Sequence, residues 1–357
     1  NNVPFFTRDG QFGTRLHGGK DAASPRYIFT KLEKLTRYLF PAEDDQLLNY
    51  VIDDGDKVQP EYYLPIIPTI LINGCTAGIG TGWSCSIPCF NPLDVITNVR
   101  IYINNKKNEE NDDYVEMVPW YNSYTGEIKK VADHKFESFG KFEKSDSNSK
   151  INVSELPIGM WTEKFKEYIE DLIEEKKVKS MKNYSKPTQV SFEIDGDLKQ
   201  FEHKLKTSIS TSNMVLFTDN SKLVKFNTVF DIVDMFCDKR FELYVLRKKV
   251  MTKQLKEDLK YMQNKLRFLT EVMDDKLNIN RKSEEVVNEM LTKELYDKKD
   301  DTFDYLLNMS LRSFTKQKVE NIEKNCKDLT QSLRDLEKLS AYDLWEGDIE
   351  HFLENYN

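Results

Sequence analysis

Two heptad patterns in the last third of the chain constrain its fold most strongly. Leucine and methionine recur at alternating steps of four and three residues from Leu255 to Met273. The same steps return from Val319 to Leu336. Such seams are typical of coiled coils, and a segment at about 276–313 separates the two. We therefore expect a long antiparallel coiled coil with a globular tip; two core helices of an ordinary bundle are the alternative.

The preceding residues favour a mixture of short strands and helices. Residues 93–105 have a helical pattern, whereas 189–194 and 214–217 are short strand-like segments between polar breaks. We therefore predict a multidomain α+β fold. The expected domains are residues 1–113, residues 114–227 with an antiparallel sheet, and residues 228–357 with the coiled coil.

Composition narrows the class of partner. No apolar run reaches the roughly 20 residues that a membrane span needs, so no membrane is expected. Five irregularly spaced cysteines suit reduced thiols rather than a disulfide framework or a zinc site. The net charge is −8, yet residues 1–40 carry seven basic side chains against three acidic ones. A basic segment on an acidic chain predicts local binding of a polyanion.

This basic segment surrounds one tyrosine. A tyrosine hydroxyl becomes a nucleophile when a neighbouring cation, base or metal stabilises its anion, and the planar fork of Arg26 beside Tyr27 suits a phosphate. Arg15 and Lys20 are candidates for flanking backbone phosphates. Residues 27–30 favour a strand, and neighbours on a strand point to opposite faces. Arg26 and Tyr27 can therefore converge on one phosphate only at a turn or twist, or they contact adjacent phosphates. From composition alone, ordinary packing of Tyr27 is the alternative.

The order of the residues is more specific than their composition. The run GQFGTRLHGGKDAASPRYI (10–28) resembles the active-site segment of eukaryotic type IIA DNA topoisomerases. The likeness continues along the whole chain, at YLPIIP (63–68), GIGTGWS (78–84), IP (87–88), ELP (155–157), NMVLF (213–217), LNMSL (307–311) and SAYDLW (340–345). The spacing from Gly74 to Gly78 is one residue longer than the usual pattern of that family. Residues 78–82 also lack the Lys-Ser/Thr of a P-loop, which favours a structural turn.

The resemblance implies a role for each matching residue. Tyr27 matches the tyrosine that attacks a DNA phosphate and stays joined to the 5′ end, and Arg26 matches the arginine that stabilises the transition state. Ile128, after Gly126, matches the place where the family inserts an isoleucine between base pairs; strand core is the alternative. Further implied DNA contacts are Trp161, Lys204, Lys206, Thr207, Ser208, Ser210, Thr211, Ser212 and Asn213. For residues 204–213 a polar edge strand is the alternative.

The resemblance also implies the architecture, partners and cofactors. A partial winged-helix domain, a tower domain and a coiled-coil exit gate would follow one another, with residues 307–311 joining two copies into a homodimer on double-stranded DNA. Magnesium and ATP would be bound by upstream metal-binding and ATPase domains of a longer, nuclear protein. No metal ligand is therefore expected in this chain, and the chain alone is not expected to cleave DNA. The alternatives are a non-enzymatic dimeric DNA-bending or scaffold protein, and a tyrosine recombinase, whose Arg and His cluster is missing here.

Overall fold

The computed structural model describes residues 2–144, 150–218, 220–279, 281–310 and 314–356. It divides into two compact units: Asn1–Arg240 with Glu346–Asn357, and Phe241–Trp345. This division does not separate 1–113 from 114–227, so the three predicted domains stay a prediction. Within the described residues, the helices lack either the length or the apolar character that crossing a bilayer requires.

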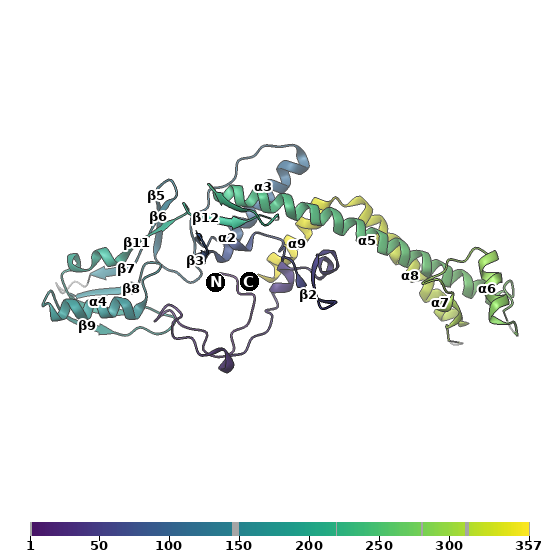
Figure 1. Cartoon of the computed structure of the whole chain (residues 1–357), viewed down its shortest axis with the longest axis horizontal. Helices are drawn as coiled ribbons and strands as arrows, with labels where there is room; N and C mark the ends of the chain where they lie inside the picture. Colours follow the sequence, from purple (N-terminus) through teal and green to yellow (C-terminus); the bar gives the residue numbers. More distant parts are fainter. Residues whose placement is uncertain (1, 145–149, 219, 280, 311–313, 357) are drawn as a thin grey trace. The chain divides into compact units, whose positions relative to one another are not determined.

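The first 113 residues contain short helices, hairpins and one longer helix (Figure 1). In chain order these elements are η1 (Pro25–Tyr27), α1 (Thr36–Leu39), η2 (Ala42–Leu47), β1 (Tyr50–Asp53), β2 (Asp56–Pro60), α2 (Thr69–Asn73), β3 (Cys75–Gly80), β4 (Trp83–Ile87) and α3 (Pro92–Asn108). The helix predicted at 93–105 is confirmed as α3. Its start follows from Asn91, whose side chain accepts a hydrogen bond from the Leu93 amide at 2.9 Å, and from Pro92 in the first turn.

The predicted antiparallel sheet is confirmed in the next segment, as two sheets. Their elements are β5 (Glu127–Ala132), β6 (Lys135–Phe139), β7 (Lys141–Lys144), β8 (Lys150–Glu155), α4 (Thr162–Glu174), β9 (Val178–Asn183), β10 (Phe192–Gly196), η3 (Leu198–Gln200), η4 (Glu202–Leu205) and β11 (Lys206–Ser210). The strand orders are β7-β8-β10-β9 and β11-β6-β5, with antiparallel pairs throughout. Among the described residues of this segment, α4 is the one α-helix. Asp197 caps the short 3₁₀ turn η3 through the Lys199 amide.

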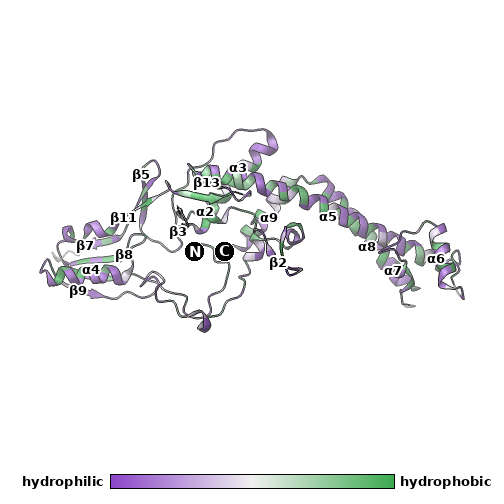
Figure 2. Ribbon diagram, viewed as in Figure 1, coloured by the Kyte–Doolittle hydropathy of each residue, from purple (hydrophilic) through white to green (hydrophobic). Residues whose placement is uncertain are grey.

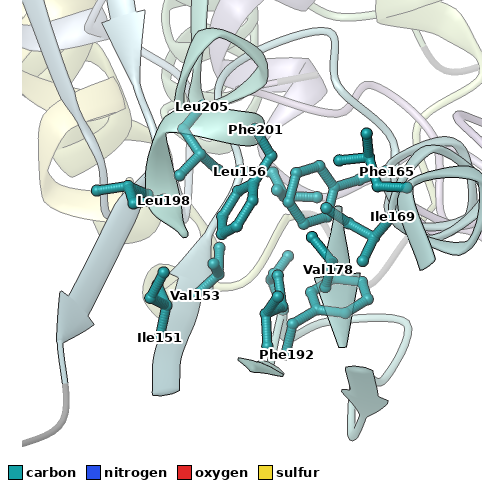
Figure 3. Close-up of a cluster of buried hydrophobic side chains, with 13 residues drawn as sticks. Ile151, Val153, Leu156, Phe165, Ile169, Val178, Phe192, Leu198, Phe201 and Leu205 are labelled. Carbon is teal, nitrogen blue, oxygen red and sulfur yellow. The ribbon is translucent and has the colours of Figure 1, made fainter. Parts of the chain in front are cut away.

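Helix α4 covers one face of the four-stranded sheet. Figure 3 shows Phe165 and Ile169 of α4 facing Val153 and Phe192 of the sheet, with Phe201 closing one side. Phe165 packs edge-on against Phe192 at 5.3 Å between ring centroids. Each fully buried side chain of this size contributes about 1.5–3 kcal/mol, so this core holds the sheet and the start of α4 as one body.

The remaining elements are β12 (Met214–Phe217), β13 (Leu223–Phe226), α5 (Val229–Met273), α6 (Glu284–Lys293), α7 (Asp304–Leu307), α8 (Lys316–Lys338) and α9 (Ala341–Asn355). The second heptad pattern is confirmed as the inner face of α8. Its six positions are Val319, Ile322, Cys326, Leu329, Leu333 and Leu336, all buried or half-buried. Hydrophilic and hydrophobic residues alternate along α5 and α8 in Figure 2.

Helices α5 and α8 contact each other within the second unit. Lys256 of α5 pairs with the Glu337 carboxylate at 2.8 Å, and Lys248 donates to the Glu337 carbonyl. Phe241, near the start of this stretch of α5, stacks on Tyr342 of α9. As the chain runs forward from Glu337 to Tyr342, its partners on α5 run backward from Lys256 to Phe241. This is the antiparallel order that the heptad patterns predict. A separate core around Phe268, Leu291 and Phe303 lies at the segment between the two long helices.

Candidate functional site

Tyr27 lies at an exposed turn rather than in the predicted strand. Residues Pro25–Tyr27 form the 3₁₀ helix η1, in which the Tyr27 amide donates to the Ser24 carbonyl at 2.9 Å. Strand-like pairing begins only at Phe29, which exchanges two backbone hydrogen bonds with Asp9. The turn brings the Arg26 guanidinium over the Tyr27 ring, 4.8 Å from its centroid, and leaves Tyr27 64% exposed. The two side chains therefore lie on the same side, which a regular strand would not allow.

The glycine-rich loop before this turn is held by specific hydrogen bonds. Asp21 accepts from the Thr14 amide at 2.8 Å and from the Thr14 hydroxyl at 2.5 Å. These bonds, the hydroxyl bond first, lower the pKa of Asp21. Lys20, the residue before Asp21, is exposed and is available to an anion.

Arg15 has a different position from the one expected of a phosphate contact. Both terminal nitrogens of its guanidinium reach Glu155, and one of them also donates to the Leu156 carbonyl at 3.2 Å. Glu155 is only 3% exposed and also accepts from the Thr125 amide and hydroxyl. An arginine that neutralises a buried carboxylate is not available to DNA without breaking that pair. The structure therefore assigns Arg15 to joining the N-terminal loop to the end of β8.

Trp161 also joins this loop to the start of α4. It precedes α4 and is 37% exposed, and its indole occupies the space beside Gly18. A Cβ on Gly18 would lie 2.3 Å from the Trp161 ring, and Gly18 has φ +64°. The backbone at the start of α4 is also bonded to the loop, because the Glu163 amide donates to the Leu16 carbonyl at 3.0 Å. Part of Trp161 is thus used to position the loop that leads to Tyr27.

Gly18→Ala is expected to lower the stability of unit 1 more than Gly19→Ala. Both glycines have positive φ, so both alanine variants carry about 1 kcal/mol of backbone strain. Only at Gly18 does the new methyl collide with a ring, since nothing lies within 4 Å of a Cβ at Gly19. Overpacking adds about 1–3 kcal/mol. Thermal unfolding measures both variants, and equal losses would contradict the packing of Trp161 on Gly18.

The predicted contact segment 204–213 is split between two environments. Strand β11 alternates, so Lys206, Ser208 and Ser210 are exposed. Thr207 points inward, where it bonds the Ser138 hydroxyl and the Ile158 carbonyl, both at 2.7 Å. Thr211 is buried against His134. The surface available to a phosphate is therefore made by the exposed members.

The other members of this segment are partly engaged within the protein. Lys206 pairs with Glu137 at 2.7 Å, and Lys204 lies over the Tyr168 ring at 4.9 Å. The Ser212 and Ser210 hydroxyls are hydrogen-bonded at 2.8 Å, and the Asn213 side-chain amide donates to the Ser84 hydroxyl at 2.9 Å. These surface contacts are individually weak, so a polyanion can compete for both lysines.

Ile128 does not lie on the face that carries the exposed serines. In the register of β11-β6-β5, Ile128 and Thr207 both pair with Ser138, whereas Ser208 pairs with Glu137. Cross-strand partners share a face, so Ile128 lies on the opposite face, where it is half-buried. Such a position suits the packing of a strand better than insertion into DNA.

Ile79 is an exposed isoleucine that our sequence reasoning missed. It is 86% exposed, next to the tip of the β3–β4 hairpin. Trp83 covers Gly80 at the tip, with the indole 2.2 Å from where a Cβ would lie, and packs edge-on against Phe217 of β12 at 5.5 Å. The motif Gly78-Ile79-Gly80 was a signal, because an isoleucine in a glycine-rich hairpin next to its tip has few bulky side chains nearby to bury it.

The described residues contain no group of three or more His, Cys, Asp or Glu side chains that could hold a metal ion. The described residues therefore do not by themselves fit a magnesium site.

Comparison with known proteins agrees with these motifs. Residues 1–350 match the family model that describes the A subunits of DNA gyrase/topoisomerase IV. The chain is 40% identical to DNA topoisomerase 2 of Invertebrate iridescent virus 6 over 98% of its length, and 35% identical to human DNA topoisomerase 2-beta over 99%. It spans only 31% and 24%, respectively, of those two relatives.

A solved structure shows that the likeness extends to the fold. The crystal structure of the Plasmodium falciparum topoisomerase II DNA-binding, cleavage and re-ligation domain matches with a TM-score of 0.88 and 35% identity. The match covers 99% of this chain and 52% of that one. The expected mixed α and β fold is confirmed by this match, and the chain belongs to the family of the DNA gyrase/topoisomerase IV A subunits, with its similarity to DNA topoisomerase 2 extending along its whole length.

Proposed function

We propose that this chain is the breakage–reunion part of an ATP-dependent type IIA DNA topoisomerase. The Tyr27 hydroxyl oxygen attacks a backbone phosphorus, a new Tyr–O–P bond forms, and the bond to the 3′ oxygen breaks. The 3′ hydroxyl leaves and the protein stays joined to the 5′ end. Attack by that hydroxyl on the phosphotyrosine reverses both changes and reseals the strand. Two copies acting on one duplex give a transient double-strand break for passage of a second duplex.

The observation that carries this proposal is the pairing of Arg26 with Tyr27 on an exposed turn. An exposed tyrosine can reach a phosphate in a bulky duplex, and the guanidinium 4.8 Å from its ring is close enough to share that phosphate. Its donors would stabilise the charge that develops on the phosphoryl oxygens. Lys20 and the exposed residues Lys206, Ser208 and Ser210 would hold the flanking backbone.

Magnesium and ATP belong to the proposed whole protein rather than to the residues described here. Magnesium would stabilise charge at the reacting phosphate, and ATP would drive strand passage. A homodimer through the segment between α5 and α8 is part of the same proposal: Leu307 and Met309 lie half-buried against its core, while Leu311 lies outside the described residues. A nuclear location stays a prediction, because the relatives include a viral protein and a mitochondrial one.

The test is to trap the covalent complex with denaturant. The chain replaces the matching part of a full-length relative, and this protein is supplied with magnesium and DNA. After digestion, mass spectrometry identifies the residue that carries a nucleotide. A nucleotide on Tyr27 supports the proposal. An adduct on another residue, or DNA bending with no adduct, contradicts it, and the latter result favours a non-enzymatic DNA-bending scaffold.

We further propose that Ile79, rather than Ile128, is the apolar wedge that enters the DNA. An inserted side chain unstacks a base step and kinks the duplex, so it must be exposed before binding. Ile79→Ala is expected to lower the bent fraction of a labelled duplex several-fold, measured by energy transfer between its ends. Ile128→Ala is the matched control and leaves bending unchanged. The opposite ranking of the two variants would return the role to Ile128.

A further inference from the structure

The β3–β4 hairpin contains two cysteines brought together by a bulge. Cys75 pairs with Ile87, and Gly78 pairs with Cys85, so three steps along β3 match two steps along β4. One extra residue on one strand is a β-bulge, and it coincides with the extra residue between Gly74 and Gly78. Because Ile87 and Cys85 are two apart on one strand, they share a face, and their partners Cys75 and Gly78 lie on it too.

Gly78 leaves room for the two thiols to meet. A Cβ on Gly78 would lie 2.7 Å from Cys75 Sγ and 3.3 Å from Cys85 Cβ, so both groups border the same missing side chain. Cys75 Sγ also lies 3.8 Å from the Cys85 carbonyl oxygen. Burial raises the pKa of the Cys85 thiol, and the neighbouring Cys75 thiol raises it further. Cys75 is the more accessible of the two, because Cys85 is only 4% exposed.

We propose that Cys75 and Cys85 form a reversible disulfide, and that this pair is a modification site for low-molecular-weight disulfides such as oxidised glutathione. The Cys75 thiolate attacks one sulfur of the oxidant and releases one glutathione thiolate. Cys85 then loses its proton and attacks Cys75 Sγ in the mixed disulfide, which releases the second glutathione. Two protein thiols are oxidised and one glutathione disulfide is reduced to two thiols.

Cys89 serves as an internal comparison. It is also buried in this region, but its thiol donates to the Asn73 carbonyl at 3.1 Å and packs beside Gly74. Burial raises its pKa as well. Local burial is therefore common to Cys85 and Cys89, and the contact with Cys75 distinguishes Cys85.

The bridge would close the base of the hairpin that exposes Ile79. Strand β4 is also joined to the end of the 204–213 segment, since the Ser86 amide donates to the Asn213 carbonyl at 2.8 Å. Oxidation would thus act on the same hairpin as the proposed wedge. The disulfide itself does not depend on the proposed function, and it is tested without DNA.

The experiment treats the reduced 357-residue chain with oxidised glutathione and quenches it in denaturant with N-ethylmaleimide. Chymotrypsin cleaves after Trp83, which places Cys75 in fragment 72–83 and Cys85 with Cys89 in fragment 84–90. We expect the two fragments to stay joined until a reductant is added, both in the unchanged chain and in Cys89→Ser. We also expect the internal disulfide to exceed the glutathione adduct of Cys75 about tenfold, because the second thiol is held nearby.

Two variants identify the partners, and reduced samples are first compared by thermal unfolding. Cys85→Ser is expected to lose the joined product and to accumulate a glutathione adduct on Cys75. Fragments that remain joined in Cys85→Ser, through Cys89, would overturn the proposal. The proposal would also be overturned if the unchanged chain kept a stable glutathione adduct on Cys75 while Cys85 was alkylated. It would equally be overturned if the chain stayed reduced under conditions that fully oxidise a control dithiol peptide. If Cys85→Ser does not fold, Cys89→Ser decides the question. Loss of the joined fragments in that variant would show that Cys89, not Cys85, is the partner, and would overturn the proposal.

Discussion

Tyr27→Phe is expected to abolish the covalent protein–DNA complex while leaving the fold and DNA affinity nearly unchanged. The change removes one hydroxyl from a ring that is 64% exposed, so little packing is lost. A phenyl ring has no hydroxyl oxygen that can attack the phosphorus. The measurement is the yield of DNA that remains bound to protein after denaturation.

Tyr63→Phe is the matched control for that variant. Tyr63 is 65% exposed and packs edge-on against Phe40, so its loss of a hydroxyl has the same structural cost. The covalent complex should form normally in Tyr63→Phe. A complex that persists in Tyr27→Phe would remove Tyr27 as the nucleophile, and one lost in both variants would point to a general effect on folding.

The long helices were the most predictable part of the fold, because their signals are local. A heptad step fixes which side of a helix is apolar, and on α8 the six heptad positions are buried or half-buried. Asn91-Pro92 carries both a cap and a favoured first residue, so the start of α3 is specified by two adjacent positions. In these segments the sequence determines the structure without reference to distant residues.

The turn at Tyr27 could not be predicted from propensity. Tyrosine, isoleucine and phenylalanine favour strands, but strand propensity depends on a pairing partner. In this chain the pairing partner is Asp9, and its backbone bonds begin at Phe29. Residues 25–28 instead close a 3₁₀ turn onto the Ser24 and Pro25 carbonyls. The expected strand was therefore wrong at the proposed catalytic position itself, and the structure has there the kind of turn that lets Arg26 and Tyr27 converge.

Arg15 and Ile128 show a different limit. A basic residue near a tyrosine indicates a phosphate contact, but the partner of Arg15 is Glu155, which lies 140 positions further along the chain. The exposure of an isoleucine likewise depends on which strands pack against it: Ile128 is half-buried, whereas Ile79 is 86% exposed. Charge and residue type indicate what a side chain can do, while tertiary pairing decides whether it is free to do so.

Asp44→Asn is expected to lower the free energy of unfolding by about 3–5 kcal/mol, the cost of leaving one member of a buried ion pair without its partner. Asp44 of η2 lies 2.7 Å from Arg240 of α5, and both side chains are almost fully buried. Arg240 also donates to the Leu64 carbonyl at 3.0 Å, so one guanidinium joins η2, the 63–68 motif and α5. Denaturant unfolding of the 357-residue chain measures the loss.

The adjacent Asp45 gives the control, because it forms an ion pair of similar length that is exposed to solvent. Asp45 pairs with Arg37 at 2.8 Å, and both side chains are about half exposed. Solvent screening limits such a pair to about 0–1 kcal/mol, so Asp45→Asn should have little effect. A similar small loss in both variants would mean that Asp44 is hydrated rather than buried. A large loss only in Asp44→Asn would make burial, not bond length, the reason that Arg240 anchors the first turns of α5.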